Sequence, residues 1–486
     1  MLFNSFSFLV FFPVVTTLYF ILPQRLRWQF LLLASCFFYM AFIPAYILVL
    51  FFIIAIDYAA GILIENTYGR ARKAYLALSI TANLGVLVAF KYLNFFSQTL
   101  NQLGHWAHLQ GELPVLSWIL PLGLSFHTFQ AMSYTIEVYR GNQRAERRFG
   151  IYALYVMFYP QLVAGPIERP QNLIHQFDEK HSFDYHRVTN GLKLMSWGML
   201  KKVVIADRLA PFVSQVYDSP YAYQGFPLIL ATFFFAFQIY CDFSGYSDIA
   251  IGAAQVMGFK LMRNFDSPYF AQSTADFWRR WHVSLSSWFR DYVYIPLGGS
   301  RTSQPRIFFN LMIAFLLSGL WHGANWTFIV WGILNGIYVG VGRWSKPLRD
   351  RFNPWAGRES LPKLCTFAKI ALTFSLICFS WIFFRAENLT DALYISTHLG
   401  AGIQDSLQDI SGSVLLGQGP KDMLIVLFWL LALLVTDFLR MRFRLRELLS
   451  AQPFWLRWGI YYAIVVGILL LGRFGHDARQ FIYFQF

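Results

Sequence analysis

Two histidines have surroundings that could support chemistry. The first, His322, lies near the middle of a run between Arg306 and Arg343 that holds no charged residue, in the sequence Trp-His-Gly-Ala-Asn-Trp. A helix crosses the hydrocarbon core of a membrane in about 20 residues, so this run predicts two helices that meet at the Gly-Ala-Asn break. His322 then lies deep in the bilayer beside unwound backbone. An ionisable group at that depth is either a satisfied buried residue or a functional one.

The second histidine, His282, lies in a stretch from Asp276 to Tyr292 that is rich in tryptophan and arginine. As one continuous helix, the stretch carries an apolar stripe and a separate polar stripe that places Arg279 and Arg290 on the face of His282. Arginine binds phosphate and carboxylate groups through paired donors, so this face suits an anionic group. The alternative is an amphipathic helix at the membrane interface whose arginines contact lipid headgroups.

A buried neutral imidazole has one obvious chemical use. It can take the proton of a hydroxyl group while the oxygen attacks an acyl carbon such as that of a thioester, which is worth ~10²–10⁴ in rate. A proton-coupled transporter also uses a buried histidine near a helix break. The residues alone therefore leave an acyltransferase and a transporter open. The candidate catalytic residues are His322 and His282, and the candidate substrate-binding residues are Arg279, Arg290, Trp321 and Asn325.

The composition requires that these residues be positioned by membrane helices. Of the 486 residues, 56% are hydrophobic and only 14% are charged, whereas soluble domains carry about 25% charged residues. The net charge of +14 comes from short basic clusters between apolar runs. Such clusters are typical of cytoplasmic loops beside anionic lipid and do not indicate nucleic-acid binding. The four scattered cysteines predict neither a disulfide framework nor a zinc site.

The apolar runs predict an all-α polytopic fold with roughly eleven transmembrane helices. The runs cover residues 3–23, 28–64 (two spans), 74–97, 114–137, 219–241, 306–343 (two spans), 366–384, 423–439 and 458–472. Between residues 149 and 208 polar residues interrupt the pattern, which predicts re-entrant or interfacial helices. Basic loops lie on the cytoplasmic side, so loops 24–27, 66–73 and 140–148 place the N-terminus outside the cytoplasm.

Several sequence blocks together are typical of one family. They are LPLGLSFHTFQAMSYTIEVYRG (120–141), FYPQLVAGPIERP (158–170), YCDFSGYSDIAIG (240–252), DFWRRWHVSLSSWFRDYVYIPLGGSR (276–301), LSGLWHGANWTFIVWG (317–332) and WIFFRAENL (381–389). With these blocks the sequence resembles the membrane-bound O-acyltransferase (MBOAT) family. It is most like the bacterial branch that contains the membrane subunits of alginate and peptidoglycan O-acetyltransferases.

The resemblance implies a single transmembrane domain over residues 1–486, with its signature region at 240–332 and its helices around a central funnel or tunnel. It implies that His322 is the family's invariant histidine and general base. It also implies that His282 occupies a second motif position that is often Asn, Asp or His. The donor implied is acetyl-CoA from the cytoplasm, with no bound cofactor and no metal.

The resemblance also implies a location and partners. The protein would lie in a bacterial inner membrane and work with an extracytoplasmic acetyl-handling protein similar to SGNH hydrolases. The acceptor would be a hydroxyl of an extracytoplasmic polysaccharide, either an alginate-like exopolysaccharide or peptidoglycan. Two alternatives remain: transfer of D-alanine from a carrier protein to teichoic acid, and export of acyl groups without chemistry.

Overall fold

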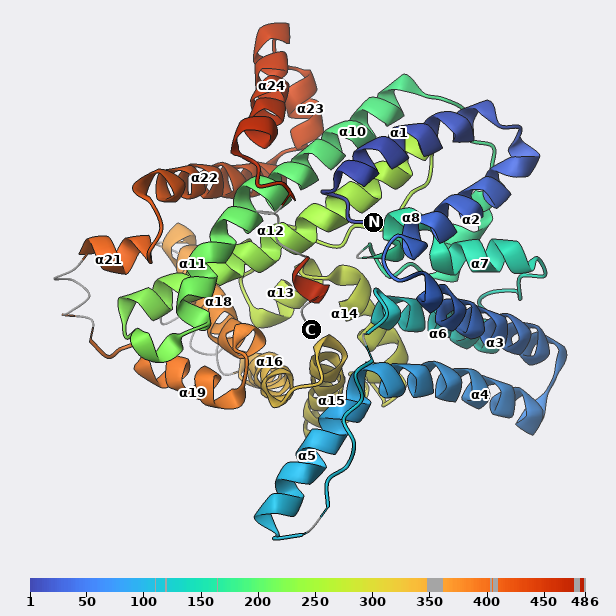
Figure 1. The fold of residues 1–486 in the computed structure, drawn as a ribbon, viewed down its shortest axis with the longest axis horizontal. Helices are drawn as coiled ribbons and strands as arrows, with labels where there is room; N and C mark the ends of the chain where they lie inside the picture. Colours follow the sequence, from blue (N-terminus) through green and yellow to red (C-terminus); the bar gives the residue numbers. More distant parts are fainter. Residues whose placement is uncertain are drawn as a thin grey trace. The chain divides into compact units, whose positions relative to one another are not determined.

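The computed structural model describes an all-helical protein, as the sequence predicts. The described residues are 1–109, 111–118, 120–163, 165–347, 362–402, 404, 410–475 and 481–484, and every regular element among them is a helix (Figure 1). The chain divides into two compact units. Unit 1 comprises Met1–Trp197 and Tyr246–Met262, and unit 2 comprises Gly198–Gly245 and Arg263–Phe486. The single domain over residues 1–486 stays a prediction.

Six helical stretches in the described part of the chain are long and apolar enough to cross a membrane. They are Pro44–Asn66, Gly69–Trp106, Phe226–Met257, Lys363–Arg385, Pro420–Arg442 and Phe454–Leu471. The sequence predicted roughly eleven spans, so only part of that count is confirmed. The predicted span at 219–241 and the apolar segment after it are one helix, α12 (Phe226–Met257). The predicted span at 114–137 starts later, because α6 begins at Leu124.

Unit 1 is built from helices that are linked by buried polar groups. Its elements include α1 (Phe6–Ile21), α2 (Gln24–Met40), α3 (Ile47–Asn66), α4 (Gly69–Leu87), α5 (Leu93–Trp106), α6 (Leu124–Arg140), α7 (Phe149–Met157), α8 (Tyr159–Leu162), α9 (Pro170–Leu173) and most of α10 (Tyr185–Leu200). The carboxylate of Asp57 on α3 accepts hydrogen bonds from Ser79 (2.6 Å) and Asn83 (2.7 Å) on α4. Ser79 also contacts the hydroxyl of Thr135 on α6 at 2.9 Å. These bonds satisfy polar groups that would be costly in hydrocarbon and join three helices.

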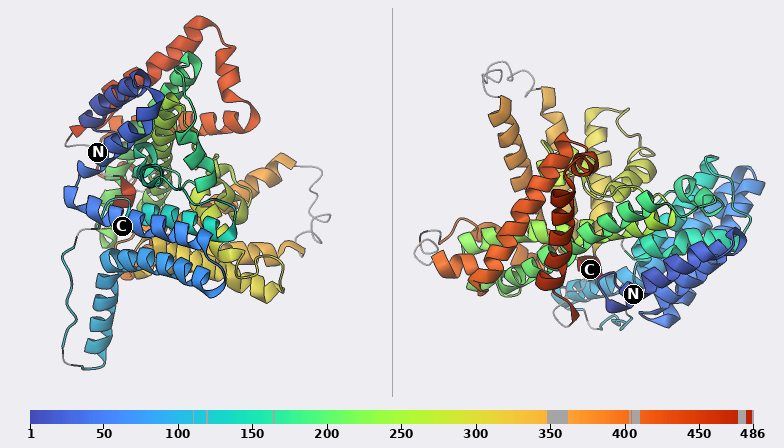
Figure 2. Two further views of the ribbon diagram at one scale, coloured as in Figure 1. Left: turned by 90° about the vertical axis from the view of Figure 1, so that its right-hand side faces the viewer. Right: turned by 90° about the horizontal axis from the view of Figure 1, so that it is seen from above.

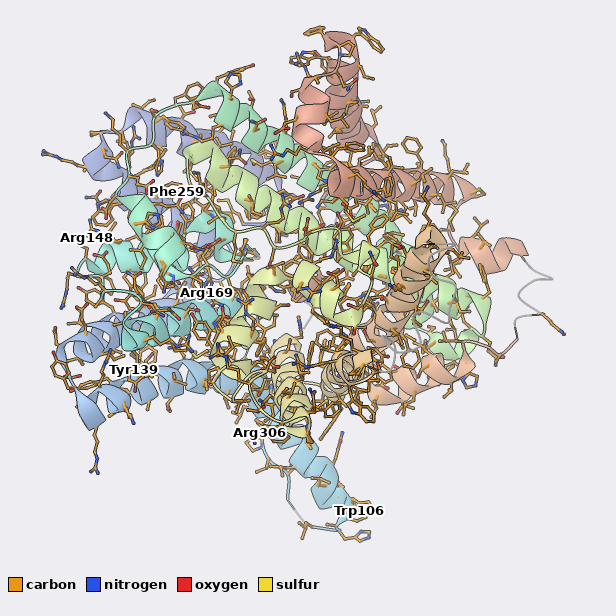
Figure 3. The ribbon with its side chains drawn as sticks, turned by 180° about the vertical axis from the view of Figure 1, so that it is seen from behind. Trp106, Tyr139, Arg148, Arg169, Phe259 and Arg306 are labelled. Atoms are coloured by element: carbon orange, nitrogen blue, oxygen red, sulfur yellow. The ribbon has the colours of Figure 1, made fainter. Side chains whose placement is uncertain are left out.

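Helix α5 projects from the rest of unit 1 in each view that shows it from the side (Figures 1 and 2). Trp106, labelled in Figure 3, lies near its end and is 84% exposed. Two asparagines fasten the helix to the chain that returns along it. Asn94 and Asn101 each pair with both the N–H and the carbonyl of one backbone residue, Leu116 and Leu113 respectively.

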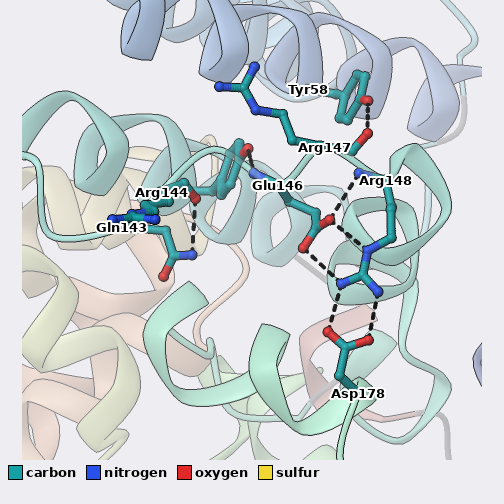
Figure 4. A network of polar contacts seen from close by, with 8 residues as sticks. Tyr58, Gln143, Arg144, Glu146, Arg147, Arg148 and Asp178 are labelled. Atoms are coloured by element: carbon teal, nitrogen blue, oxygen red, sulfur yellow. Dashed lines mark hydrogen bonds and ion pairs between the residues drawn. The ribbon is translucent and has the colours of Figure 1, made fainter.

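The basic loop after α6 is ordered by a network of charged side chains (Figure 4). Arg148 donates to both carboxylate oxygens of Asp178 at 2.6 Å and to Glu146 at 3.0 Å. The Arg148 guanidinium therefore holds the pKa of Asp178 below its usual value. The hydroxyl of Tyr58 on α3 donates to the carbonyl of Arg147 at 2.6 Å. This loop is one of the segments predicted to face the cytoplasm.

Unit 2 holds the sequence blocks that contain both histidines. Its elements include α11 (Asp207–Tyr217), the first part of α12, α13 (Thr274–Arg280), α14 (Val283–Phe289), α15 (Gln304–His322), α16 (Trp326–Trp344), α18 (Pro362–Arg385), α19 (Leu389–His398), α21 (Ile410–Leu415), α22 (Pro420–Arg442), α23 (Leu445–Ser450) and α24 (Phe454–Leu471). Helices α15 and α16 form a tightly packed hairpin, which can be followed in gold in Figures 1 and 2. Its glycines permit the close approach, because a Cβ atom at Gly332 would lie 2.5 Å from the carbonyl oxygen of Phe315.

Candidate functional site

His322 is the last residue of α15, and the helix break predicted beside it is confirmed. Helix α16 begins three residues later at Trp326, after Gly323, Ala324 and Asn325. Asn325 is the N-cap of α16: its side-chain oxygen accepts from the N–H of Thr327 at 3.1 Å. Its amide nitrogen donates to the carbonyl of Glu387 at 2.9 Å. The structure thus uses both ends of this side chain to fix the turn that carries His322.

The imidazole of His322 is buried in a box of aromatic rings. Its ring centre lies 4.9 Å from Trp331, 5.0 Å from Trp321, 5.1 Å from Phe384 and 5.5 Å from Tyr483. Only 4% of the residue is exposed. Well-packed rings restrict the orientation of the imidazole, which a general base requires.

His282 lies at a break between two short helices, so the prediction of one continuous helix over 276–292 is wrong. Helix α13 ends at Arg280, α14 begins at Val283, and His282 between them has a left-handed backbone with φ of 42°. The left-handed residue turns the chain out of the helical path. The side chains before and after it therefore do not form the single polar stripe that helical spacing predicts.

The two arginines of that predicted stripe are largely exposed, whereas His282 is buried. The side chains of Arg279 and Arg290 are 71% and 62% exposed, whereas His282 is 1% exposed. Each arginine has a carboxylate close by: Arg279 lies 3.4 Å from Asp276 and Arg290 lies 2.8 Å from Asp291. Their role in binding an anionic donor stays a prediction, and an arginine-lined face around His282 is not observed.

A buried asparagine holds the ring of His282 in place. Nδ1 of His282 lies 3.2 Å from Oδ1 of Asn264, and this oxygen also accepts from the N–H (3.2 Å) and the hydroxyl (2.9 Å) of Ser284. Because an amide oxygen is only an acceptor, Nδ1 carries the proton and Nε2 keeps its lone pair. Burial lowers the pKa of His282 to about 3. The ring is therefore neutral at physiological pH.

The two histidines share aromatic neighbours. Trp321 lies 5.0 Å from His322 and 5.9 Å from His282, and Tyr483 lies 5.5 Å and 6.4 Å from them. The structure thus brings together three of the predicted site residues, His322, His282 and Trp321. It adds Asn264 and Tyr483, which the sequence analysis missed. No local pattern marks these two: Asn264 lies between two of the family blocks, 18 positions before His282, and Tyr483 reaches the site from a distant part of the chain.

One polar cavity of about 230 Å³ lies in unit 2. Its lining residues are Lys202, Ala206, Asp207, Ala210, Ser214, Asp218, Gln238, Asp242, Arg385 and Ile482. Neither histidine is among them, so a funnel that reaches His322 stays a prediction. Within the described residues, no group of three or more His, Cys, Asp or Glu side chains is arranged to hold a metal ion. The expected absence of a metal likewise stays a prediction.

Comparison with known proteins gives consistent matches. The model of the MBOAT, membrane-bound O-acyltransferase, family matches residues 74–383. The chain is 38% identical to the probable alginate O-acetylase AlgI of Pseudomonas aeruginosa over 393 residues, which cover 80% of this chain and 73% of that protein. It is 36% identical to the peptidoglycan O-acetyltransferase of Helicobacter pylori over 430 residues, covering 81% and 79%. It is also 28% identical to the teichoic acid D-alanyltransferase of Streptococcus thermophilus over 285 residues, covering 54% and 68%.

Proposed function

The chain belongs to the membrane-bound O-acyltransferase family and is thus a multi-pass membrane O-acyltransferase, and on this basis we propose a more specific function. We propose that it acetylates an extracytoplasmic polysaccharide. The donor would be cytoplasmic acetyl-CoA, and the acceptor an alginate-like exopolysaccharide or peptidoglycan. The observation that carries this proposal is the aromatic box that holds His322 beside His282. The names of two relatives, an alginate O-acetylase and a peptidoglycan O-acetyltransferase, support the choice of acetyl groups.

In the proposed mechanism His322 is the general base. The hydroxyl oxygen of the acceptor attacks the thioester carbonyl carbon, and the imidazole takes the hydroxyl proton. The new C–O bond forms, the C–S bond breaks, and the proton passes from the imidazolium to the leaving thiolate. His282, whose neutral ring presents Nε2, assists by orienting the donor or the developing charge. The exposed arginines Arg279 and Arg290 are the proposed contacts for anionic groups of the donor.

The proposal includes a location and an orientation. The chain would lie in a bacterial inner membrane with its N-terminus outside the cytoplasm, and roughly eleven spans would surround a central funnel. The basic loops at 24–27, 66–73 and 140–148 support this orientation. An extracytoplasmic protein similar to SGNH hydrolases would receive the acetyl group on a serine, or the polysaccharide hydroxyl would receive it directly.

Replacement of the general base tests the mechanism. His322→Ala should lower acetyl transfer from labelled acetyl-CoA by ~10²–10⁴, because general-base assistance is lost. The assay uses purified protein and follows CoA release together with transfer of the label. His398→Ala is the control, since His398 stacks on Tyr394 at 4.0 Å elsewhere in unit 2. Near-full activity of a folded His322→Ala protein would rule the mechanism out.

The similarity to a teichoic acid D-alanyltransferase supports a second candidate, D-alanyl transfer from a carrier protein. Its lower identity and smaller coverage make it the weaker candidate. A neighbouring gene for a D-alanine-activating enzyme would favour it, and a gene for a secreted hydrolase-like acetyltransferase would favour acetyl transfer. A pure exporter of acyl groups would release no free CoA from acetyl-CoA.

A further inference from the structure

The segment 481–484, which no motif marks, packs against both histidines of unit 2. Phe481 and Ile482 are at most 2% exposed, and the Tyr483 ring contacts His322 and His282. Figure 1 shows this segment as the red turn beside α13 and α14. Tyr483 also lies 4.5 Å from Phe243, whose ring is 4.6 Å from His282. The tyrosine is therefore wedged among the rings that define the site.

A buried ionic cluster fastens this segment to α12. Oδ2 of Asp242 accepts the backbone N–H of Ile482 at 2.7 Å, and Oδ1 of Asp242 lies 2.7 Å from the Lys202 ammonium. The ammonium also lies 2.9 Å from Asp207, and all three charged side chains are at most 4% exposed. One ammonium faces two carboxylates, so the N–H of Ile482 offers Asp242 a further donor for its charge. The hydrogen bond to Ile482 is thus part of a buried network, and buried networks hold their members rigidly when satisfied.

We propose that Tyr483 is a positioning residue of the acyl-transfer site, held in place by the bond between the Ile482 N–H and Asp242. This inference rests on the proposed function. The ring of Tyr483 closes one side of the aromatic box around His322 and also contacts the ring of His282. It restricts the orientation of both imidazoles, so that Nε2 or Nδ1 of the general base meets the acceptor hydroxyl at the required angle.

Substitution of Tyr483 tests the role of the ring. Tyr483→Ala should lower kcat for CoA release from acetyl-CoA by up to about 10²-fold, the loss expected for a misplaced catalytic group, and should leave KM for acetyl-CoA unchanged. Tyr483→Phe should restore most of kcat, because the ring contacts remain. The control is Tyr217→Ala, since Tyr217 is a buried tyrosine of unit 2 that packs on Phe235 and Arg385.

Substitution of Ile482 tests the anchor without changing any charge. Ile482 is the first residue of a short 3₁₀ turn, where proline fits the backbone but has no N–H to donate. Ile482→Pro should therefore lower kcat more than Ile482→Ala, which keeps the N–H. If the anchor acts through Tyr483, Ile482→Pro has no further effect on kcat in the Tyr483→Ala background. Additive losses in the double variant would contradict the proposal.

A chemical readout separates this inference from the proposed function. Carbethoxylation of His322 by diethyl pyrocarbonate, measured by peptide mass spectrometry, needs no acetyl transfer. Its rate should rise several-fold in Tyr483→Ala and Ile482→Pro and stay at the wild-type value in Tyr217→Ala. If the Tyr483→Ala variant has the kcat and the His322 carbethoxylation rate of the wild type, the positioning role is overturned, although the enzyme can still be an acetyltransferase. Absence of CoA release from the wild type would instead overturn the proposed function, and the carbethoxylation rates would still decide whether Tyr483 covers His322.

Discussion

At the scale of residues, a single amide oxygen organises the second histidine. Oδ1 of Asn264 meets three donors, one on His282 and two on Ser284. Removing a buried acceptor leaves its donors desolvated without compensation, which costs about 1–3 kcal/mol for each group left unsatisfied. Asn264 therefore contributes to the site although it lies between two of the motif blocks and outside both.

Asn264→Ala should reduce both activity and stability. The imidazole of His282 loses the acceptor that fixes its tautomer but keeps its position in the chain, so CoA release should fall by roughly tenfold, less than the ~10²–10⁴ expected when a general base is removed altogether. The measurement is the CoA release rate together with the melting temperature in detergent. Asn310→Ala is the control, because buried Asn310 makes one long bond of 3.4 Å to the carbonyl of Gly299. Equal effects of the two substitutions would contradict the role of Asn264.

Glu168 in unit 1 should make stability depend on pH. The residue lies outside the six apolar helices, accepts a hydrogen bond from the N–H of Met262, and is fully buried. Burial raises the pKa of Glu168 to about 7. The folded state then binds more protons than the unfolded state between the unfolded pKa of ~4.3 and about 7, so the free energy of unfolding falls as pH rises through this window.

Glu168→Gln keeps an acceptor for Met262 and cannot ionise. The melting temperature of the wild type should therefore fall more steeply between pH 5 and pH 8 than that of the variant. The difference corresponds to about 1.4 kcal/mol for each unit of pKa shift. Parallel melting curves for the two proteins across this range would show that the burial of Glu168 has no such effect.

At the scale of elements, the hairpin of α15 and α16 depends on glycine at specific positions. Gly332→Ala places a Cβ against the backbone of Phe315 and should push the helices apart, which lowers the melting temperature and moves His322. Gly342 on the same helix is the matched control, because a Cβ atom added there would come no nearer than 3.8 Å to a neighbouring group, the Oγ1 of Thr274. Gly342→Ala should be neutral or slightly stabilising, since alanine favours a helix by about 1 kcal/mol over glycine. Identical melting temperatures for the two variants would contradict this account.

The two helix breaks show what sequence patterns can reveal. The break at Gly323–Asn325 was predictable, because the uncharged run is too long for one span and a glycine and an asparagine mark the turn. The break at His282 was not, because the amphipathic spacing continues through it. A non-glycine residue with a left-handed backbone does not interrupt the spacing of apolar and polar residues. At His282 this backbone occurs together with contacts of the ring with Asn264 and Phe243. Tertiary contacts of this kind are invisible to helical spacing.

At the scale of the whole molecule, the histidine motifs and the apolar character were readable from the sequence, but the division into two units was not. Helices α10 and α12 each contribute residues to both units, so no linker or change of composition marks the boundary. Tyr483 reaches the site from 161 positions beyond His322, a count taken from the residue numbers. Such a long-range contact has no local sequence signature, whereas the family blocks located both histidines directly.

The proposed orientation predicts which loops face the outside of the cell. In a background without the four native cysteines, Gln102→Cys should react with a membrane-impermeant maleimide on intact cells. Arg144→Cys, in the loop of Figure 4, should react only after permeabilisation. Both positions are exposed on the protein, so accessibility differs only through the membrane. The reverse labelling pattern would contradict the proposed orientation.

The left-handed backbone at His282 limits which mutations that position can survive. For most L-residues this conformation costs about 1–2 kcal/mol, while Asn, Asp and His adopt it several-fold more often than other side chains. These are the three residue types that the family resemblance expects at this position. The backbone conformation therefore restricts the residue types at this position independently of any catalytic role. An evolving sequence can exchange the imidazole for a carboxylate or an amide here without refolding the turn, and has few other choices.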